Sequence, residues 1–397
     1  MNISTPAVIL NRKVTHRLLN GHLWVYATEV ERIEGHPASG DVVAVRDGTG
    51  RALAWGFFNS TSKIAVRVLT RQERAIDTAF LRERLQAAIA HRDRVLPGRP
   101  ARRLVSSEGD LLPGLIVDQY GDTLVVQCTT VGIDRRLSEI VTLLQELLNP
   151  KVIIERNDLA VRGYEGLPHR RGVLVGDHQG TLRVRVGKAD FPCDPLDPHK
   201  TGLYLDQQVS WEQVATFVRP GMRVLDTFSH LGGFGIHALQ AGAEHALAID
   251  TAADSITGAT QAADWAGVAA RFETRCDNAF DVLKDLDNAG TRYDLIILDP
   301  PSFTRSRATV DGALRGYKEI HLRALRMLNP GGVLATYTCS HHISATIFQD
   351  MINDAAQDVG RTLRREAIHG ASPDHPVLAA VPESEYLKGF VLRVLDC

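Results

Sequence analysis

The chain has 397 residues, of which 44% are hydrophobic and 23% are charged, and this length suffices for two or three domains with separate cores. No stretch is long and apolar enough to span a membrane, and the first residues lack the basic-then-apolar plan of a secretory signal. The five cysteines are scattered and odd in number, which argues against a disulfide framework and favours a cytoplasmic protein. No Cys-x-x-Cys pair or His-Glu-x-x-His stretch indicates a metal, so we expect none.

The net charge of −2 hides an asymmetry between the two halves of the chain. Residues 1–190 carry 27 Lys and Arg against 21 Asp and Glu, giving +6, whereas residues 191–397 carry 18 against 26, giving −8. A mildly basic first half joined to an acidic second half indicates that the two halves have different functions. A difference of this size alone decides nothing about nucleic acid.

Residues 6–72 are typical of short strands separated by frequent turns. The apolar or alternating runs lie at residues 42–45, 53–57 and 64–69. Gly-Asp and Asp-Gly pairs punctuate these runs, so the pattern predicts a small β-barrel. From residue 76 to residue 95 the apolar residues recur at helical spacing, and Pro97 stops the helix. We interpret this segment as a connecting helix at a domain boundary.

Residues 101–190 return to strand patterns around one helix. Apolar runs at 115–118 and 124–128 flank Tyr120-Gly121-Asp122, which is a hairpin signal. A helix is predicted over 136–148, and it is followed by strands at 152–155 and 182–186. The order strand-strand-helix-strand-strand predicts a small α+β domain.

From about residue 191 apolar strands alternate with helices. The strands are predicted at residues 224–228, 246–250, 295–299 and 333–336. Continuous apolar strands of this kind indicate a parallel, doubly wound sheet. The fold class is therefore α/β, with a Rossmann-like C-terminal sheet at 191–397 preceded by the β-barrel at 1–75 and the linker helix and α+β domain at 76–190.

The first two strands of the C-terminal half carry a nucleotide-binding pattern. A turn with Gly232 and Gly233 opens a helix, and Asp250 ends the next strand, where it could accept hydrogen bonds from ribose hydroxyls. The turn is not Gly-x-Gly-x-x-Gly, and Asp226 inside the first strand would repel a pyrophosphate. Its carboxylate suits the ammonium of an amino-acid ligand instead. S-adenosylmethionine combines such an ammonium with a ribose, so we predict this cofactor.

The adenine end of the cofactor has two candidate partners between the strands predicted at 246–250 and 295–299. Asp277 or Asn278 could receive the adenine amino group. A helix N-cap is the alternative role for Asp277.

At this point the chain resembles a known family over nearly its full length. The matching stretches are residues 21–26, 108–115, 199–207, 299–303, 315–320 and 338–340. The C-terminal half is similar to class I S-adenosylmethionine-dependent methyltransferases, and the whole chain resembles the bacterial PUA-domain 23S rRNA cytosine-5 methyltransferases of the large-subunit methyltransferase I type. The resemblance implies an RNA-binding PUA barrel, a small central domain and a methyltransferase domain.

The resemblance also implies the partners and the cofactor contacts. The partner is RNA, either 23S rRNA or a large-subunit particle, with no membrane involved, and a homodimer is the oligomeric state we consider. The residues assigned to the cofactor are Gln207, Asp226, Phe228, Ser229, Gly232, Gly233, Asp250, Asp277, Asn278 and Asp299.

Two strand ends carry a carboxylate and a thiol, Asp299 before Pro300-Pro301 and Cys339 in Thr-Cys-Ser. C5 of cytosine is a poor nucleophile, and a thiolate that adds to C6 activates it. We therefore assign Cys339 as the nucleophile and Asp299 as the partner of protonated N3. We expect nearby cations to depress the pKa of the thiol.

An alternative to this assignment stays open. Cys339 could be a buried structural cysteine in an enzyme that methylates an exocyclic base nitrogen, because such enzymes share the acidic-Pro-Pro motif.

Ser302 stands where another group of RNA cytosine-5 methyltransferases has a cysteine for product release. The group that removes the C5 proton therefore remains open.

Cations around the predicted active site are candidates for RNA phosphates. The residues assigned to RNA are Lys200, Arg305, Arg315 and Lys318. Arg307 lies in the same loop, and a solvated charge run is the alternative for each of these residues. His341 and His342 follow Cys339, and we interpret them as solvent-facing or helix-capping rather than as proton carriers.

Overall fold

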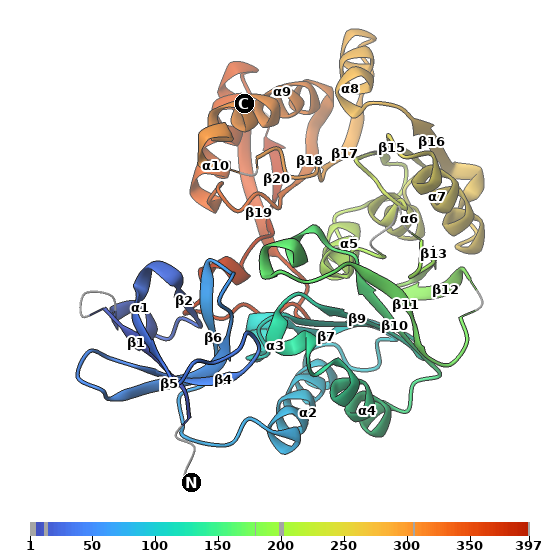
Figure 1. The fold of residues 1–397 in the computed structure, drawn as a ribbon. Coiled ribbons are helices and arrows are strands. Elements are labelled where there is room, and N and C mark those ends of the chain that lie inside the picture. The colour runs from blue at the N-terminus through green and yellow to red at the C-terminus, as the bar shows by residue number, and fades with distance from the viewer. Residues whose placement is uncertain (1–4, 12–14, 179, 198–201, 305, 396–397) are drawn as a thin grey trace. The chain divides into compact units, whose positions relative to one another are not determined.

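The computed structural model describes residues 5–11, 15–178, 180–197, 202–304 and 306–395 (Figure 1). The chain divides into two compact units, each with its own core. The first unit comprises residues 1–182, 194–203 and 373–384, and the second comprises residues 183–193, 204–372 and 385–397. Among the described helices, none is long and apolar enough to cross a membrane.

The first sheet of the first unit has six strands. They are β1 (Ala7–Leu10), β2 (Trp24–Tyr26), β3 (Val30–Glu34), β4 (Val42–Arg46), β5 (Ala52–Phe58) and β6 (Ile64–Thr70), in the order β2-β6-β5-β4-β1-β3. The three strands predicted between residues 42 and 69 are confirmed as β4, β5 and β6. The sequence missed the other three because β1 and β2 are very short and β3 is charged and largely exposed. The short helix α1 (Thr15–Leu19) precedes β2.

A second sheet of five strands completes the first unit. Its members are β7 (Ala101–Ser106), β8 (Leu115–Tyr120), β9 (Thr123–Cys128), β10 (Val152–Asn157) and β11 (Arg170–Val175), in the order β11-β10-β9-β8-β7. The predicted hairpin is confirmed, because β8 and β9 are antiparallel around Gly121-Asp122.

Helices α2 (Thr78–Val95) and α4 (Leu137–Leu148) share the core of this sheet, beside the short α3 (Val131–Asp134). Asp77 caps α2 by accepting a hydrogen bond from the Phe80 N–H at 3.0 Å. Phe80, Leu81 and Leu85 are buried with the strand residues. The segment interpreted as a connecting helix is therefore part of this core.

The strand predicted at 182–186 is confirmed, but it does not belong to the five-stranded sheet, so its predicted place in the α+β domain is wrong. It forms β12 (Leu182–Val186), which pairs only with β13 (Ala189–Cys193) in a two-stranded hairpin. Arg183 and Arg185 are exposed on β12, and each forms a 2.7 Å ion pair with Asp190 across the hairpin. The strand that completes the sheet is β11, whose two arginines and glycine concealed the strand pattern.

The second unit contains a seven-stranded sheet. Its strands are β14 (Arg223–Thr227), β15 (His245–Asp250), β16 (Phe272–Cys276), β17 (Tyr293–Leu298), β18 (Leu328–Thr338), β19 (Thr362–Gly370) and β20 (Lys388–Leu395). The order is β16-β15-β14-β17-β18-β20-β19, with the first five strands parallel and β20 antiparallel to both of its neighbours. The predicted doubly wound α/β sheet is confirmed.

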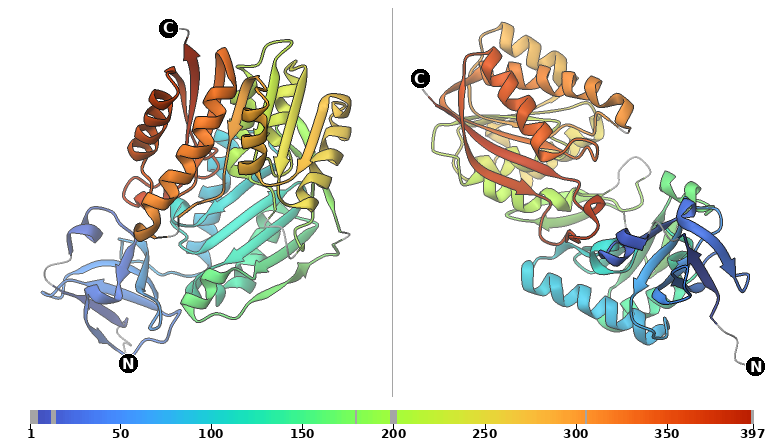
Figure 2. Two further views of the ribbon diagram at one scale, coloured as in Figure 1. Left: turned by 90° about the horizontal axis from the view of Figure 1, so that it is seen from above. Right: turned by 90° about the vertical axis from the view of Figure 1, so that its left-hand side faces the viewer.

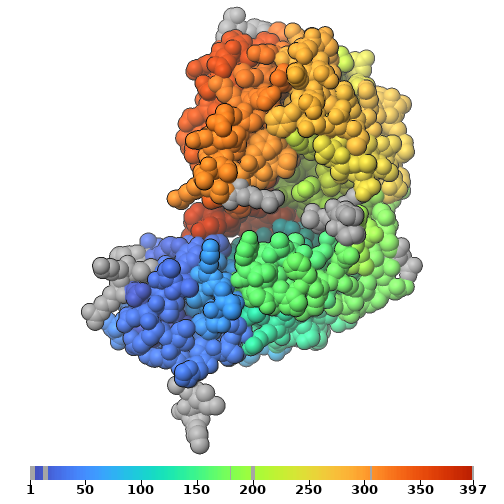
Figure 3. Space-filling view, turned by 45° about the horizontal axis from the view of Figure 1, so that its top comes forward, coloured from blue at the N-terminus to red at the C-terminus, as the bar shows by residue number. Residues whose placement is uncertain are grey.

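Helices cover both faces of this sheet. On one face α8 (Ala279–Asn288), α9 (Val310–Met327) and α10 (Ala345–Asp358) pack into a single apolar core with the strands. The right-hand view of Figure 2 shows the orange and red helices of this group on one side of the strands. α5 (Gln208–Ala215), α6 (Gly233–Gln240) and α7 (Ala253–Trp265) belong to the other face. Yellow and orange segments form much of the outer surface of this unit in Figure 3.

Candidate active site

The register of the parallel strands places Asp226, Asp299 and Cys339 on one face of the sheet at its carboxyl edge. Asp226 of β14 pairs with Ile297 of β17, and Ile297 pairs with Ala335 of β18. Because alternate residues of a strand point to the same face, Asp299 and Cys339 continue the row that Asp226 begins. Ligands of open α/β sheets bind at this edge.

A strained turn joins β14 to α6 at this edge. Phe228, His230 and Gly232 all have positive φ, at 58°, 48° and 73°. A Cβ on Gly232 would lie 2.6 Å from the Phe272 ring, so glycine is required for both space and backbone conformation. Strain of this kind is typical of ligand-binding turns.

Asp250 at the end of β15 holds this turn in place. One carboxylate oxygen accepts a hydrogen bond from the His230 N–H at 2.9 Å, and the other accepts one from the Ala252 N–H at 2.9 Å. Both bonds fix the orientation of the carboxylate at the edge of the site. Each oxygen keeps a second lone pair for a hydroxyl donor.

Three buried polar atoms at this edge have no hydrogen-bond partner among the described residues: Asp226 Oδ1, Ser229 Oγ and Gln207 Oε1. The other Asp226 oxygen accepts the Gly235 N–H at 2.9 Å. Burial raises the pKa of Asp226 well above its ordinary range. Unpaired buried acceptors cost free energy, and an ammonium and hydroxyl groups supply the donors that these acceptors need. The residues present thus fit S-adenosylmethionine.

Gly233, the first residue of α6, also has no room for a side chain. A Cβ there would lie 2.3 Å from the Trp211 ring. The helix start therefore approaches its neighbours closely, as the Gly-rich pattern predicts.

The two candidate adenine partners have local partners of their own. Asn278 is the N-cap of α8, and its side chain accepts a hydrogen bond from the Phe280 N–H at 2.9 Å. Asp277 is not the cap. It accepts the Asn278 N–H at 2.7 Å and forms a 3.1 Å ion pair with Arg275. Their contacts to adenine stay a prediction.

Asp299 follows β17 directly and is held by Gln207 from the short 3-10 turn η4 (Leu205–Gln207). The Gln207 Nε2 donates a hydrogen bond to Asp299 Oδ2 at 2.9 Å. Burial, with the nearby negative charge of Asp206, raises the pKa of Asp299 to about 7, although the Gln207 bond lowers it. Asp206 itself accepts a hydrogen bond from the Tyr386 hydroxyl at 2.6 Å. Near neutral pH, Asp299 is therefore a carboxyl group that can give or take a proton.

Cys339 follows β18 and is partly buried, and the expectation of a depressed thiol pKa is wrong. Burial raises the pKa of Cys339, and the charges of Asp299 and Asp206 raise it further. The Lys388 ammonium acts in the opposite direction. The sequence shows which cations are close along the chain, but not the burial of the thiol or the carboxylates that are distant in sequence and near in space.

Lys388 is the cation that the sequence analysis missed. It begins β20 opposite Thr338, is only 9% exposed, and its Nζ donates a 3.0 Å hydrogen bond to the Ser340 carbonyl. Burial lowers the pKa of this ammonium. A lysine within the apolar run of residues 387–392 is unusual, and that contrast is the signal that could have identified it.

A buried network joins the two loops that carry the reactive groups. The Tyr317 hydroxyl lies 2.8 Å from Thr338 Oγ1 and 3.1 Å from Ser340 Oγ. Ser340 Oγ lies 3.0 Å from Ser302 Oγ, three residues after Asp299. Ser302, at the position where a cysteine was considered, therefore anchors the Asp299 loop to the Cys339 loop.

The candidate RNA cations differ in their surroundings. Lys318 forms ion pairs with Asp354 at 2.6 Å and Asp358 at 2.8 Å, so carboxylates already compensate its charge. Arg315 is exposed on α9. Lys200 and Arg305 lie outside the described residues.

The other described cysteines lie on other strands. Cys128 and Cys193 are buried on β9 and β13, and Cys276 is exposed at the end of β16.

Comparisons with known proteins agree with this geometry. Residues 8–71 match the model of PUA-like domains, and residues 174–373 match the model of S-adenosylmethionine-dependent methyltransferases. The chain is 36% identical over 399 residues to ribosomal RNA large subunit methyltransferase I of Klebsiella pneumoniae (strain 342), covering 98% of both chains. It is 37% identical over 381 residues to the protein of the same name from Aeromonas salmonicida (strain A449), covering 95% of this chain and 96% of that one.

Solved structures show the same fold. An S-adenosylmethionine-dependent methyltransferase from Streptococcus mutans superposes with a TM-score of 0.83 at 18% identity, covering 98% of this chain and all of that one. SMU.776, a methyltransferase complexed with SAH, superposes with a TM-score of 0.84 at 18% identity and the same coverage. The predicted fold class, cofactor and family resemblance are confirmed. The chain belongs to the ribosomal RNA large subunit methyltransferase I family and is an S-adenosylmethionine-dependent methyltransferase.

Proposed function

We propose that the protein transfers a methyl group from S-adenosylmethionine to C5 of a cytosine in RNA, with 23S rRNA, free or in a large-subunit particle, as the substrate. The observation that carries the proposal is the pair of Asp299 and Cys339 on one face at neighbouring strand ends. The names of the relatives support rRNA as the substrate, and the thiol selects C5 among the atoms of the base.

The bound cofactor supplies an electrophilic methyl group. The thiolate of Cys339 adds to C6 of the cytosine, and the electron pair of the C5–C6 double bond becomes available at C5 for the methyl group. Asp299 shares a proton with N3, which takes up the negative charge that develops on the ring. Loss of the C5 proton then restores the double bond and expels the thiolate.

The raised pKa values of Asp299 and Cys339 are consistent with this sequence of steps. A carboxyl group with a pKa of about 7 is partly protonated at neutral pH, so it can donate to the unprotonated N3 of cytosine. The ionised form of Asp299 raises the pKa of the Cys339 thiol. Protonation of Asp299, or its pairing with a protonated N3, removes this repulsion. Thiol activation is in this way coupled to the arrival of the base.

We assign RNA affinity to the PUA-like domain within residues 1–75, and chemistry to residues 191–397, with residues 76–190 between them. In the first of these parts, Arg67 forms ion pairs with Glu108 and Glu165. Arg46 ends β4, and the exposed Arg51 follows it with one ion pair, to Asp47 at 3.2 Å. We expect both to contribute more to RNA binding than Arg67, which is largely buried and has two ion pairs.

The test is covalent trapping on an rRNA transcript made with 5-fluorocytidine. Fluorine at C5 cannot leave as a cation, so the adduct should persist after methyl transfer and shift the protein on a denaturing gel. Cys339→Ala should lose both the adduct and 5-methylcytosine while still binding S-adenosylmethionine. Cys276→Ala is the matched control, since that thiol is exposed at another strand end, and it should retain both.

Nucleoside mass spectrometry of the product separates this proposal from its rival. A Cys339→Ala enzyme that still makes 5-methylcytosine would refute the covalent mechanism. A methyl group on an exocyclic nitrogen of adenine or guanine would replace the proposal with base N-methylation and leave Cys339 a structural residue.

A further inference from the structure

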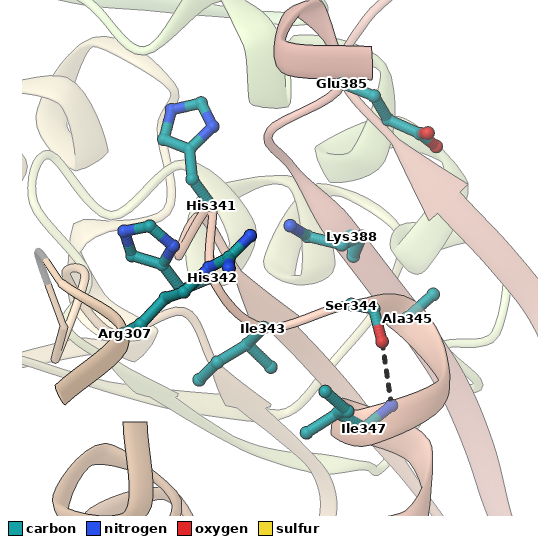
Figure 4. Close-up of a pocket in the computed structure, with 9 residues that line it drawn as sticks. All are labelled: Arg307, His341, His342, Ile343, Ser344, Ala345, Ile347, Glu385 and Lys388. Carbon is teal, nitrogen blue, oxygen red and sulfur yellow. Dashed lines mark hydrogen bonds between the residues drawn. The ribbon is translucent and has the colours of Figure 1, made fainter. Parts of the chain in front are cut away.

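A cationic pocket lies two residues beyond Cys339 within the second unit, and the proposed catalytic steps do not use it (Figure 4). The side chains that line it come from four places in the sequence. They are Arg307, His341, His342, Ile343, Ser344, Ala345, Ile347, Glu385 and Lys388. Its volume of about 310 Å³ is roughly ten times the share of one liquid water molecule. A phosphate group with several waters therefore has room there.

We propose that this pocket binds a phosphodiester of the substrate RNA adjacent to the methylated nucleotide. The inference rests on the proposed function and deepens it, because it names the contact that positions the RNA backbone when the base reaches Cys339.

The charge of the pocket favours an anion. The side chains of Arg307 and His342 form no hydrogen bond or ion pair with any other described residue, and both residues are exposed. Figure 4 shows the nitrogen-bearing ends of Arg307 and Lys388 directed toward the same space, whereas the Glu385 carboxylate points away from them. The one acidic side chain that lines the pocket is therefore turned from its centre. Backbone phosphates are bound by such groups of Arg, Lys and polar donors.

Backbone donors add to the side chains. Ser344 is the N-cap of α10, a helix of 14 residues, and its hydroxyl accepts the Ile347 N–H at 3.2 Å. The dashed line in Figure 4 marks this bond. The first turn of a helix presents N–H groups and a partial positive charge, both of which suit an anion.

Lys388 connects the pocket to the nucleophile. Its ammonium has three N–H donors, and one of them bonds the carbonyl of Ser340, the residue after Cys339. The side chain is buried and extends toward the pocket. His341 and His342 follow Ser340 in the chain. A phosphate in this pocket would be held by residues that begin two positions after Cys339. The position of the phosphate therefore restrains the base that reaches Cys339.

The experiment measures how binding of an unmodified large-subunit rRNA transcript to the full chain depends on salt. Removing one phosphate contact in single-stranded RNA lowers the slope of log K against log salt by about 0.7. Arg307→Gln should lower the slope, and Arg307→Lys should restore it. Arg292→Gln is the matched control, because Arg292 is equally exposed, has no acidic partner and lies at the opposite end of β17. Its slope should equal that of the wild type.

The outcomes separate this inference from the proposed function. Equal slopes for Arg307→Gln and wild type would overturn the inference even if wild type makes 5-methylcytosine. Absence of 5-methylcytosine in the wild-type product would refute the proposed function, while the slopes still decide whether the pocket binds RNA. A titration with inorganic phosphate alone covers the other source of the anion. Tight phosphate binding that Arg307→Gln abolishes, with the RNA slope unchanged, would assign the pocket to a free anion and overturn the RNA assignment.

Discussion

The replacement Gln207→Leu tests whether the protonated form of Asp299 takes part in the reaction. The Gln207 amide donates one hydrogen bond of 2.9 Å to the carboxylate and so stabilises its charged form. A hydrogen bond to a charged group contributes about 1.5–3 kcal/mol, and partial exposure of Asp299 favours the lower end. About 1.4 kcal/mol corresponds to one pH unit. The pKa of Asp299 should therefore rise from about 7 by about one pH unit.

The assay is the single-turnover methylation rate as a function of pH, at saturating S-adenosylmethionine so that any loss of cofactor affinity does not contribute. Protonated Asp299 persists to higher pH in Gln207→Leu, so the alkaline limb of the profile should move up by about one pH unit. Gln208→Leu removes the neighbouring buried amide, which does not govern the pKa of Asp299, and its limb should stay in place. An alkaline limb that stays fixed or moves down in Gln207→Leu would refute the reasoning.

Four further predictions follow from the contacts at the site. Binding of S-adenosylmethionine near pH 7 should release a proton from Asp226, because an ammonium lowers the raised pKa of this carboxyl. Calorimetry in two buffers of different ionisation enthalpy detects the released proton. Asp226→Asn should abolish the dependence of the binding enthalpy on the buffer. Asp250→Ala should weaken cofactor binding by about 1–3 kcal/mol, and unchanged affinity by calorimetry would contradict its ribose role. Lys388→Met should raise the pKa of Cys339, because it removes a cation that lowers it, and the pH midpoint of iodoacetamide alkylation measures this change. Tyr317→Phe should cost about 1–2 kcal/mol of unfolding free energy, since it removes two buried hydrogen bonds, and an unaltered thermal midpoint would show that the network is not stabilising.

The sequence predicted most of the second unit because parallel strands buried on both faces appear as continuous apolar runs. It also placed Asp250 and Asp299 correctly at strand ends, since a strand end is visible where the apolar run stops. The edge strand β19 and its neighbour β20 were not identified. β19 is largely polar and exposed, and nothing in β20 shows that it inserts antiparallel beside β18.

The electrostatics of the site could not be read from the sequence, because they depend on contacts between distant segments. Lys318 is close to the site along the chain, yet Asp354 and Asp358 on α10 compensate it. Lys388 is 49 residues after Cys339, and strand pairing brings it to the same loop. The predicted direction of the Cys339 pKa shift was wrong because burial and the charges of Asp299 and Asp206 outweigh the effect of Lys388.

The acidic groups of the site share one physical property that explains its chemistry. Burial raises the pKa of Asp226, Asp299 and Cys339, and each is raised further by neighbouring carboxylates. In the free protein the charged form of each group is therefore disfavoured, so ionising it costs free energy. The ligands of the proposed reaction carry the opposite charge, since S-adenosylmethionine has an ammonium and a sulfonium, and a proton at N3 makes the base cationic. Binding of these ligands therefore lowers the cost of ionising the carboxyl groups and the thiol, and the thiolate becomes accessible when the base is in place.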